Sequence, residues 1–82
     1  MIASARKKEP LLVVTFRTTT DVLSLEAAAK EAGIPGRIIP VPGAVKAGCG
    51  LAFAAPPDTG EALRRFMTQK QIRWEGIHEL LL

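Results

Sequence analysis

Apolar residues fall into short runs along the chain, and the spacing within each run predicts alternating strands and helices. The run LLVVTF at 11–16 is rich in β-branched residues and predicts a strand that is buried on one or both faces. Three later runs predict further strands at 36–41 (GRIIPV), 50–55 (GLAFAA) and about 74–81. The pattern therefore indicates a four-stranded protein.

The segment after the first strand predicts a helix. Thr18 and Asp21 have the three-residue spacing of a capping box, with Asp in place of the usual Glu. At the other end, Gly33 followed by Ile34 suits a left-handed helix terminus with a hydrophobic contact behind it. The apolar residues in between recur at helical spacing: Val22, Leu25, Ala28, Ala29 and Ala32. The small alanine side chains imply close packing against a sheet.

A second helix is predicted after the third strand. Asp58 and Glu61 repeat the capping-box spacing, and the helical pattern continues to about Lys70. Its expected buried stripe is formed by Ala62, Leu63, Phe66 and Met67. Beyond it, we expect Trp74 to cover one end of the sheet as a half-buried residue.

The predicted order β-α-β-β-α-β is that of an α+β, ferredoxin-like sandwich. Right-handed crossovers place the first and third strands in the centre of a four-stranded antiparallel sheet, with both helices on one face. The second strand contains Pro40 and Pro42, which cannot both sit in an interior ladder, so we expect it at an edge. We expect residues 1–10 to form a flexible N-terminal tail and residues 11–82 to form a single domain.

Composition and charge exclude several classes of function. The 82 residues carry a formal net charge of +3, and the run at 6–8 supplies three of the 11 basic residues, which leaves eight against the 8 acidic ones. The rest of the chain is therefore balanced, and a nucleic-acid-binding face is not indicated. One cysteine and one histidine are too few for a zinc or iron–sulfur site, so we expect no metal and no cofactor. The absence of a long apolar run favours a cytoplasmic protein that makes no membrane contact.

Cys49 is the only cysteine, and it lies between Gly48 and Gly50 in the stretch PVPGAVKAGCGLAF at 40–53. The first two strands are predicted to run parallel, so the loop before the third strand shares a sheet edge with the exit of the first. We therefore expect Cys49 to lie beside the N-terminus of the first helix, at least partly exposed. The two glycines leave backbone amides approachable and favour a small anion nest.

Several groups at that edge favour a thiolate at Cys49. Free amides at a helix N-terminus and nearby cations both stabilise a thiolate, and Arg17 and Lys46 are the cations within reach. Thr18 and Thr19, at the start of the helix, are candidate contacts for a bound group. A free cysteine is also often a small buried apolar residue, and threonines at a helix start are often only caps. The residues alone leave both interpretations open.

Three segments of the chain resemble a known family of small domains. They are FRTTTDVLSLEAAAKEAGI, the turn PVP, and GCGLAF with the helix and short strand that follow it. On these segments, residues 11–82 resemble the Se/S carrier protein-like family. The resemblance implies that Cys49 holds a persulfide or perselenide, and that donor and acceptor enzymes of sulfur or selenium metabolism are its partners. Family members often have hydroxyl residues before the cysteine, where this chain has Ala44, Ala47 and Gly48.

Two hypotheses from different classes follow. In the first, the protein is a carrier and not an enzyme, with Cys49 in an adaptable loop as the thiol that holds the transferred atom. The binding residues around this thiol are then Gly48, Gly50, Lys46, Arg17, Thr18 and Thr19. In the second, the protein is a small-molecule-sensing or assembly module with a structural cysteine, which dimerises through sheet edges. A Cys49→Ala variant distinguishes them, because only the second function would survive it.

RNA binding and metal-chaperone activity have less support, since aromatic residues on the central strands are few and a cysteine pair is lacking.

Overall fold

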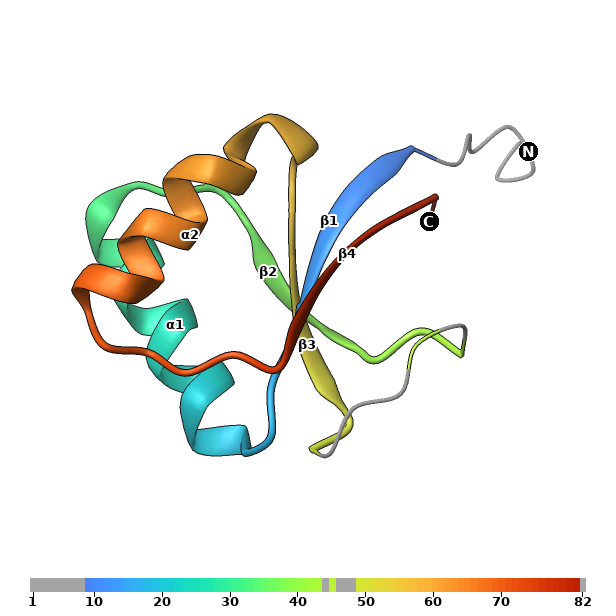
Figure 1. Ribbon diagram of the computed structural model, residues 1–82, viewed down its shortest axis with the longest axis horizontal. Coiled ribbons are helices and arrows are strands. Elements are labelled where there is room, and N and C mark those ends of the chain that lie inside the picture. Colours follow the sequence, from blue (N-terminus) through green and yellow to red (C-terminus); the bar gives the residue numbers. More distant parts are fainter. Residues whose placement is uncertain (1–8, 44, 46–48, 82) are drawn as a thin grey trace, which may run out of the picture.

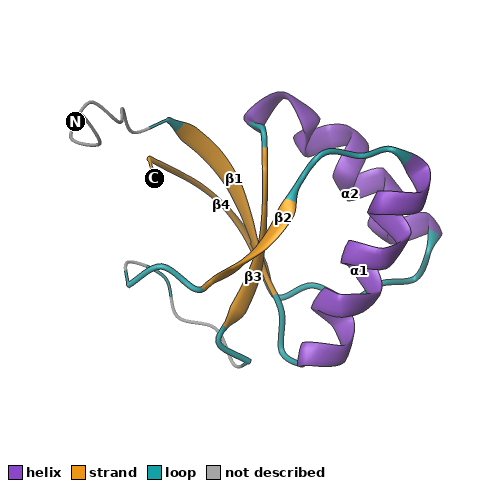
Figure 2. Ribbon diagram, turned by 180° about the vertical axis from the view of Figure 1, so that it is seen from behind, coloured by secondary structure: helices purple, strands orange, loops and turns teal. Residues whose placement is uncertain are grey.

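A computed structural model describes residues 9–43, 45 and 49–81. Its elements, in chain order, are β1 (Pro10–Thr15), α1 (Thr19–Ala32), β2 (Arg37–Pro40), β3 (Leu51–Ala55), the 3-10 helix η2 (Pro57–Thr59), α2 (Gly60–Gln69) and β4 (Gly76–Leu81). The strands form one antiparallel sheet in the order β2-β3-β1-β4. Both helices lie on the same side of this sheet (Figures 1 and 2). The predicted α+β architecture is confirmed, with β1 and β3 central and the proline-containing β2 at an edge.

The core lies between the sheet and the two helices. Val14 on β1 pairs with Phe53 on β3 and with Ile77 on β4, so these three side chains point toward the helices. From the helical side, Leu25 of α1 and Leu63 of α2 are fully buried against them. The alanine face predicted for the first helix takes part in this core, since Ala29 is buried and Ala28 packs against it.

The first helix begins and ends where its sequence signals predicted. Thr18 is the N-cap, and its Oγ1 accepts a hydrogen bond from the Asp21 backbone N–H at 3.2 Å. The same hydroxyl donates to Asp21 Oδ2 at 2.9 Å, so the Asp21 carboxylate binds the cap side chain. At the C-terminus, Gly33 is left-handed (φ 78°), and the Ile34 N–H donates to the Ala29 carbonyl at 2.8 Å. The predicted stripe is correct except at Ala32, which is exposed because it lies at the helix end, past the sheet.

The start of the second helix differs from the prediction. Pro57–Thr59 form the 3-10 helix η2, and the N-cap of α2 is Thr59, whose side chain does not cap the helix. Thr59 has helical dihedral angles (φ −91°, ψ −1°), and its hydroxyl donates back to the Pro56 carbonyl at 2.6 Å. The predicted capping box of Asp58 and Glu61 is therefore wrong, because the prolines start a tight turn that already leads into the helix.

The buried stripe of α2 is narrower than predicted. Leu63 and Met67, one helical turn apart, are fully buried, whereas Phe66 is half-buried and Ala62 is exposed. The stripe that faces the sheet passes through Leu63 and Met67, which leaves the neighbouring positions on the flank of the helix. On that flank, the Lys70 ammonium lies 5.8 Å from the centroid of the Phe66 ring. Phe66 is thus a partly exposed residue that packs against the core rather than a central part of it.

The turn after α2 places a non-glycine residue in a left-handed conformation. Gln71 has φ 58°, and the Ile72 N–H donates to the Met67 carbonyl at 2.9 Å across the turn. This is the position at which helices commonly use glycine, because a Cβ there costs about 1–2 kcal/mol. Gln71 therefore holds the exit of α2 in a strained backbone conformation.

Gln71→Gly is expected to raise the free energy of unfolding by about 0.5–1 kcal/mol, because glycine adopts the left-handed conformation without strain. Urea denaturation measures the change. Gln69→Gly, at the last residue of α2, is the matched control and is expected to lower the stability by about 0.5–1 kcal/mol. A fall in the urea midpoint of Gln71→Gly would show that side-chain contacts of Gln71 outweigh the backbone strain.

Candidate functional site

Three strand ends meet at one end of the sheet. β1 ends at Thr15, which pairs with Ala52 near the start of β3 and with Gly76 at the start of β4. The Glu75 N–H also donates to the Thr15 carbonyl at 2.7 Å, which holds the connection before β4 against the end of β1. The segment that leads into β3 therefore lies at the same end of the sheet as the start of α1 (Figure 1), as the crossover rule predicted.

Cys49 lies in this segment, two residues before β3, and is half-buried. Its Sγ donates a hydrogen bond to the Leu51 carbonyl at 3.3 Å, and its side chain packs against the hydrophobic core. Next to it, Gly50 is exposed and left-handed (φ 78°), and its carbonyl accepts from the Val41 N–H at 3.0 Å. Cys49 is thus a partly exposed residue at the point where the β2–β3 connection enters β3.

Two of the predicted site residues, Lys46 and Gly48, lie outside the described residues, as do Ala44 and Ala47. Their part in the site stays a prediction.

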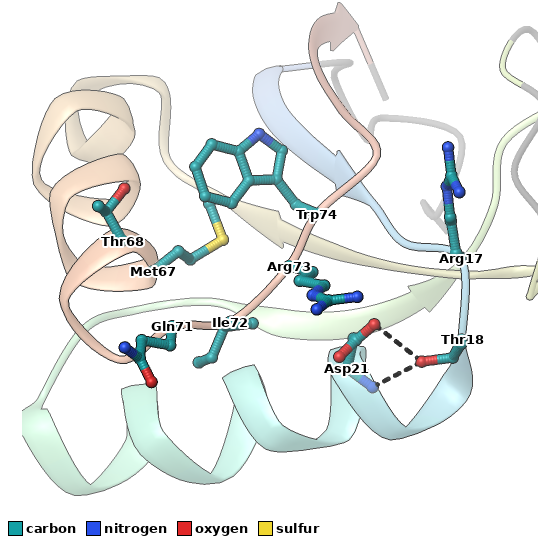
Figure 3. A pocket seen from close by; sticks show the side chains of 9 residues that line it. All are labelled: Arg17, Thr18, Asp21, Met67, Thr68, Gln71, Ile72, Arg73 and Trp74. Carbon is teal, nitrogen blue, oxygen red and sulfur yellow. Dashed lines mark hydrogen bonds between the residues drawn. The ribbon is translucent and has the colours of Figure 1, made fainter.

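The side chains at the start of α1 differ in how free they are to bind a ligand. The Thr18 hydroxyl already makes two hydrogen bonds within the cap, and Thr19 is exposed as the first residue of the helix. Asp21 is half-buried and adds a negative charge at the helix N-terminus, which opposes the binding of an anion by the free amides there. Arg17 is exposed, and its guanidinium points away from the Thr18–Asp21 pair (Figure 3). Of this group, Arg17 is the residue that can offer its charge to a bound anion.

An open pocket lies between the start of α1 and the connection from α2 to β4 (Figure 3), with a volume of about 930 Å³. We call it the Trp74 pocket. It is lined by Arg17, Thr18, Asp21, Met67, Thr68, Gln71, Ile72, Arg73 and Trp74. Trp74, which was expected to cover one end of the sheet as a half-buried residue, is half-buried. Arg73 and Gln71 carry no signal in the sequence that marks them as site residues, because only the turn after α2 brings them beside the start of α1.

Within the described part of the chain, no group of three or more histidine, cysteine, aspartate or glutamate side chains could hold a metal ion. His78 is half-buried on β4, opposite Val13 of β1.

None of the helices in the described ranges is long and apolar enough to cross a membrane.

The comparison with protein families gives a match over most of the chain. The family model described as "Putative Se/S carrier protein-like" matches residues 11–79. The chain belongs to this family. The match to the Se/S carrier protein-like family begins in β1, ends in β4 and includes Cys49. Searches of the curated proteins and of the solved structures each found no match.

Proposed function

We propose that this protein carries sulfur or selenium on Cys49 and passes the atom to a partner enzyme. The observation that supports this function is the half-exposed position of Cys49, the only thiol of the chain, within the segment matched by the Se/S carrier protein-like family. The protein itself performs no turnover chemistry. Its partners are a donor enzyme that holds a persulfide or perselenide and an acceptor enzyme that takes the atom.

Loading is a thiol exchange that needs no oxidant. The Cys49 thiolate attacks the terminal sulfur of a donor persulfide, a new S–S bond forms at Sγ, and the S–S bond of the donor breaks. The donor thiolate leaves with the electron pair, and the proton released by Cys49 protonates it or passes to solvent. Attack by an acceptor thiolate on the outer sulfur reverses these steps. Selenium follows the same path with an S–Se bond.

The surroundings of Cys49 suit a thiol that is protected at rest and released for reaction. The resting thiol donates its hydrogen to the Leu51 carbonyl, a bond that a thiolate or persulfide cannot make. Reaction therefore requires the side chain to turn away from the carbonyl and toward solvent, which its half-exposed position allows without unfolding. Arg17 is the described cation proposed to favour the anion, and Gly50 leaves the adjoining backbone open to a partner. Lys46, Gly48, Thr18 and Thr19 complete the proposed site.

Incubation of the folded protein with glutathione persulfide tests the proposal, with intact-mass measurement as the readout. The wild type is expected to gain one sulfur atom that a thiol reductant removes, whereas Cys49→Ser, the closest isostere, is expected to gain none. Alkylation of Cys49 by iodoacetamide under native conditions should go to completion without denaturant. Protection of Cys49 until the protein unfolds, or an equal mass gain in Cys49→Ser, would contradict the carrier function and leave Cys49 as a packing residue.

A further inference from the structure

The Trp74 pocket combines an apolar wall with cationic side chains. Met67 is fully buried and Ile72 nearly so, and together with the half-buried indole of Trp74 they form the apolar part. Arg17 and Arg73 are both exposed and line the same pocket. Figure 3 shows Arg17 on the side of the pocket opposite α2 and Arg73 between Arg17 and the helix. A ligand that fits this arrangement has an apolar body and a charged end.

The charges that line the pocket do not cancel. The lining contains two arginines, Arg17 and Arg73, and one carboxylate, that of Asp21, which accepts a hydrogen bond from the Thr18 hydroxyl. Among the described residues, the only ion pair within 4.0 Å joins Arg65 to Glu61, away from the pocket. Neither pocket arginine is therefore paired with a described carboxylate at that distance. One positive charge is left in excess, which matches a ligand with a single negative charge.

We propose that the Trp74 pocket binds a small monoanion with a flat apolar body, of which an aromatic carboxylate is the simplest example. Arginine binds a planar carboxylate through parallel N–H donors, and a flat ring packs well against the half-buried indole of Trp74. The pocket volume of about 930 Å³ lies within the range of about 300–1,000 Å³ common for small-molecule sites. Cys49 does not line the pocket, so this binding activity differs from the carrier function, although Arg17 belongs to both proposed sites.

Gln71 provides a further polar contact for this ligand. Its side chain lines the pocket from a left-handed backbone position, φ 58°, where glycine would be unstrained. Strained non-glycine residues of this kind occur preferentially at binding sites, where the side chain has a use that offsets the strain. The Gln71 amide can donate to a carboxylate oxygen. Gln71→Gly should therefore weaken ligand binding although it stabilises the fold, a pair of opposite effects that a purely structural role does not produce.

Intrinsic fluorescence provides a direct assay, because Trp74 is the only tryptophan and the chain contains no tyrosine. Titration with benzoate is expected to change the Trp74 emission saturably and to shift its indole N–H resonance. Benzamide, which has the same shape without the charge, is expected to bind about tenfold more weakly, as the loss of a charge-assisted hydrogen bond implies. Arg17→Gln and Arg73→Gln should each weaken benzoate binding by a similar factor. Arg64→Gln, which removes an exposed arginine of α2 outside the pocket, is the matched control and should bind benzoate like the wild type.

Three results would overturn the proposal: no saturable response to benzoate, equal binding of benzamide and benzoate, or the same loss in Arg64→Gln as in the pocket variants. Thermal unfolding of each variant shows that it is folded during the titration. The two proposals fail separately. Cys49→Ser should bind benzoate like the wild type, and Arg73→Gln should still load sulfur from glutathione persulfide.

Discussion

Phe53→Ala is expected to lower the free energy of unfolding by about 3–5 kcal/mol, as the truncation of a fully buried aromatic residue does. Phe53 lies on the central strand β3, is 1% exposed, and pairs with Val14 on one side and Ile38 on the other. The cavity would open in the middle of the core, where the sheet holds the surrounding backbone in place and limits its collapse. In a domain of this size the loss is a large share of the total stability.

Phe66→Ala is the matched control, because it removes the same atoms from a half-buried position on the flank of α2. We expect it to cost about 1–2 kcal/mol from the lost burial and the lost contact with Lys70. Urea denaturation followed by far-UV circular dichroism measures both variants. Equal losses in the two variants would show that Phe66 belongs to the core, as the helical pattern of the sequence had predicted.

The topology of the sheet could be predicted from the sequence because its signals are local and agree with one another. The β-branched run before Thr18, the cap at Thr18 and the left-handed glycine at Gly33 each fix an element or its boundary, and the structure confirms all three. The prolines of the second strand excluded it from the centre of the sheet, which left the ferredoxin-like order β2-β3-β1-β4. Once this order is set, the positions of the strand ends follow.

The errors in α2 have a common physical cause. Capping-box spacing at Asp58 and Glu61 is compatible with a helix start, but Pro56 and Pro57 impose a 3-10 turn that satisfies the backbone differently. The four apolar positions of the helix cover more of its circumference than the sheet can bury. Which of them become buried depends on the rotation of the helix against β1 and β3, which is set by long-range packing and not by the local pattern.

The two candidate sites were accessible to prediction to different degrees. The position of Cys49 follows from topology alone, because parallel β1 and β2 bring the connection before β3 to the exit of β1. The Trp74 pocket depends on the exit angle of α2, which the left-handed Gln71 determines. A glycine at position 71 would have predicted the left-handed turn, whereas a glutamine predicts that the helix continues. The juxtaposition of Arg17 and Arg73 therefore required the structure.

Gly36→Ala is expected to lower the free energy of unfolding by about 2–4 kcal/mol, through a steric conflict that the local sequence does not reveal. Gly36 precedes β2 with φ 153°, a conformation that residues with a side chain rarely adopt. A Cβ at this position would collide with the ring of Phe53 and lie 2.9 Å from the Ala54 carbonyl oxygen. Since β2 is an edge strand, the conflict is expected to be relieved by partial loss of its pairing with β3.

Two further glycine variants separate the causes of this loss. Gly43→Ala introduces a Cβ into open space at a position without a left-handed φ and should change the stability by less than about 0.5 kcal/mol. Gly33→Ala introduces backbone strain (φ 78°) without a steric conflict and should cost about 1 kcal/mol. In a Phe53→Leu background, which removes the ring, Gly36→Ala should cost less than in the wild type, and the double-mutant cycle measures this coupling. If Gly36→Ala cost the same in both backgrounds, the ring of Phe53 would not be what requires glycine at this position, and the loss would come from the backbone conformation and the conflict with the Ala54 carbonyl oxygen.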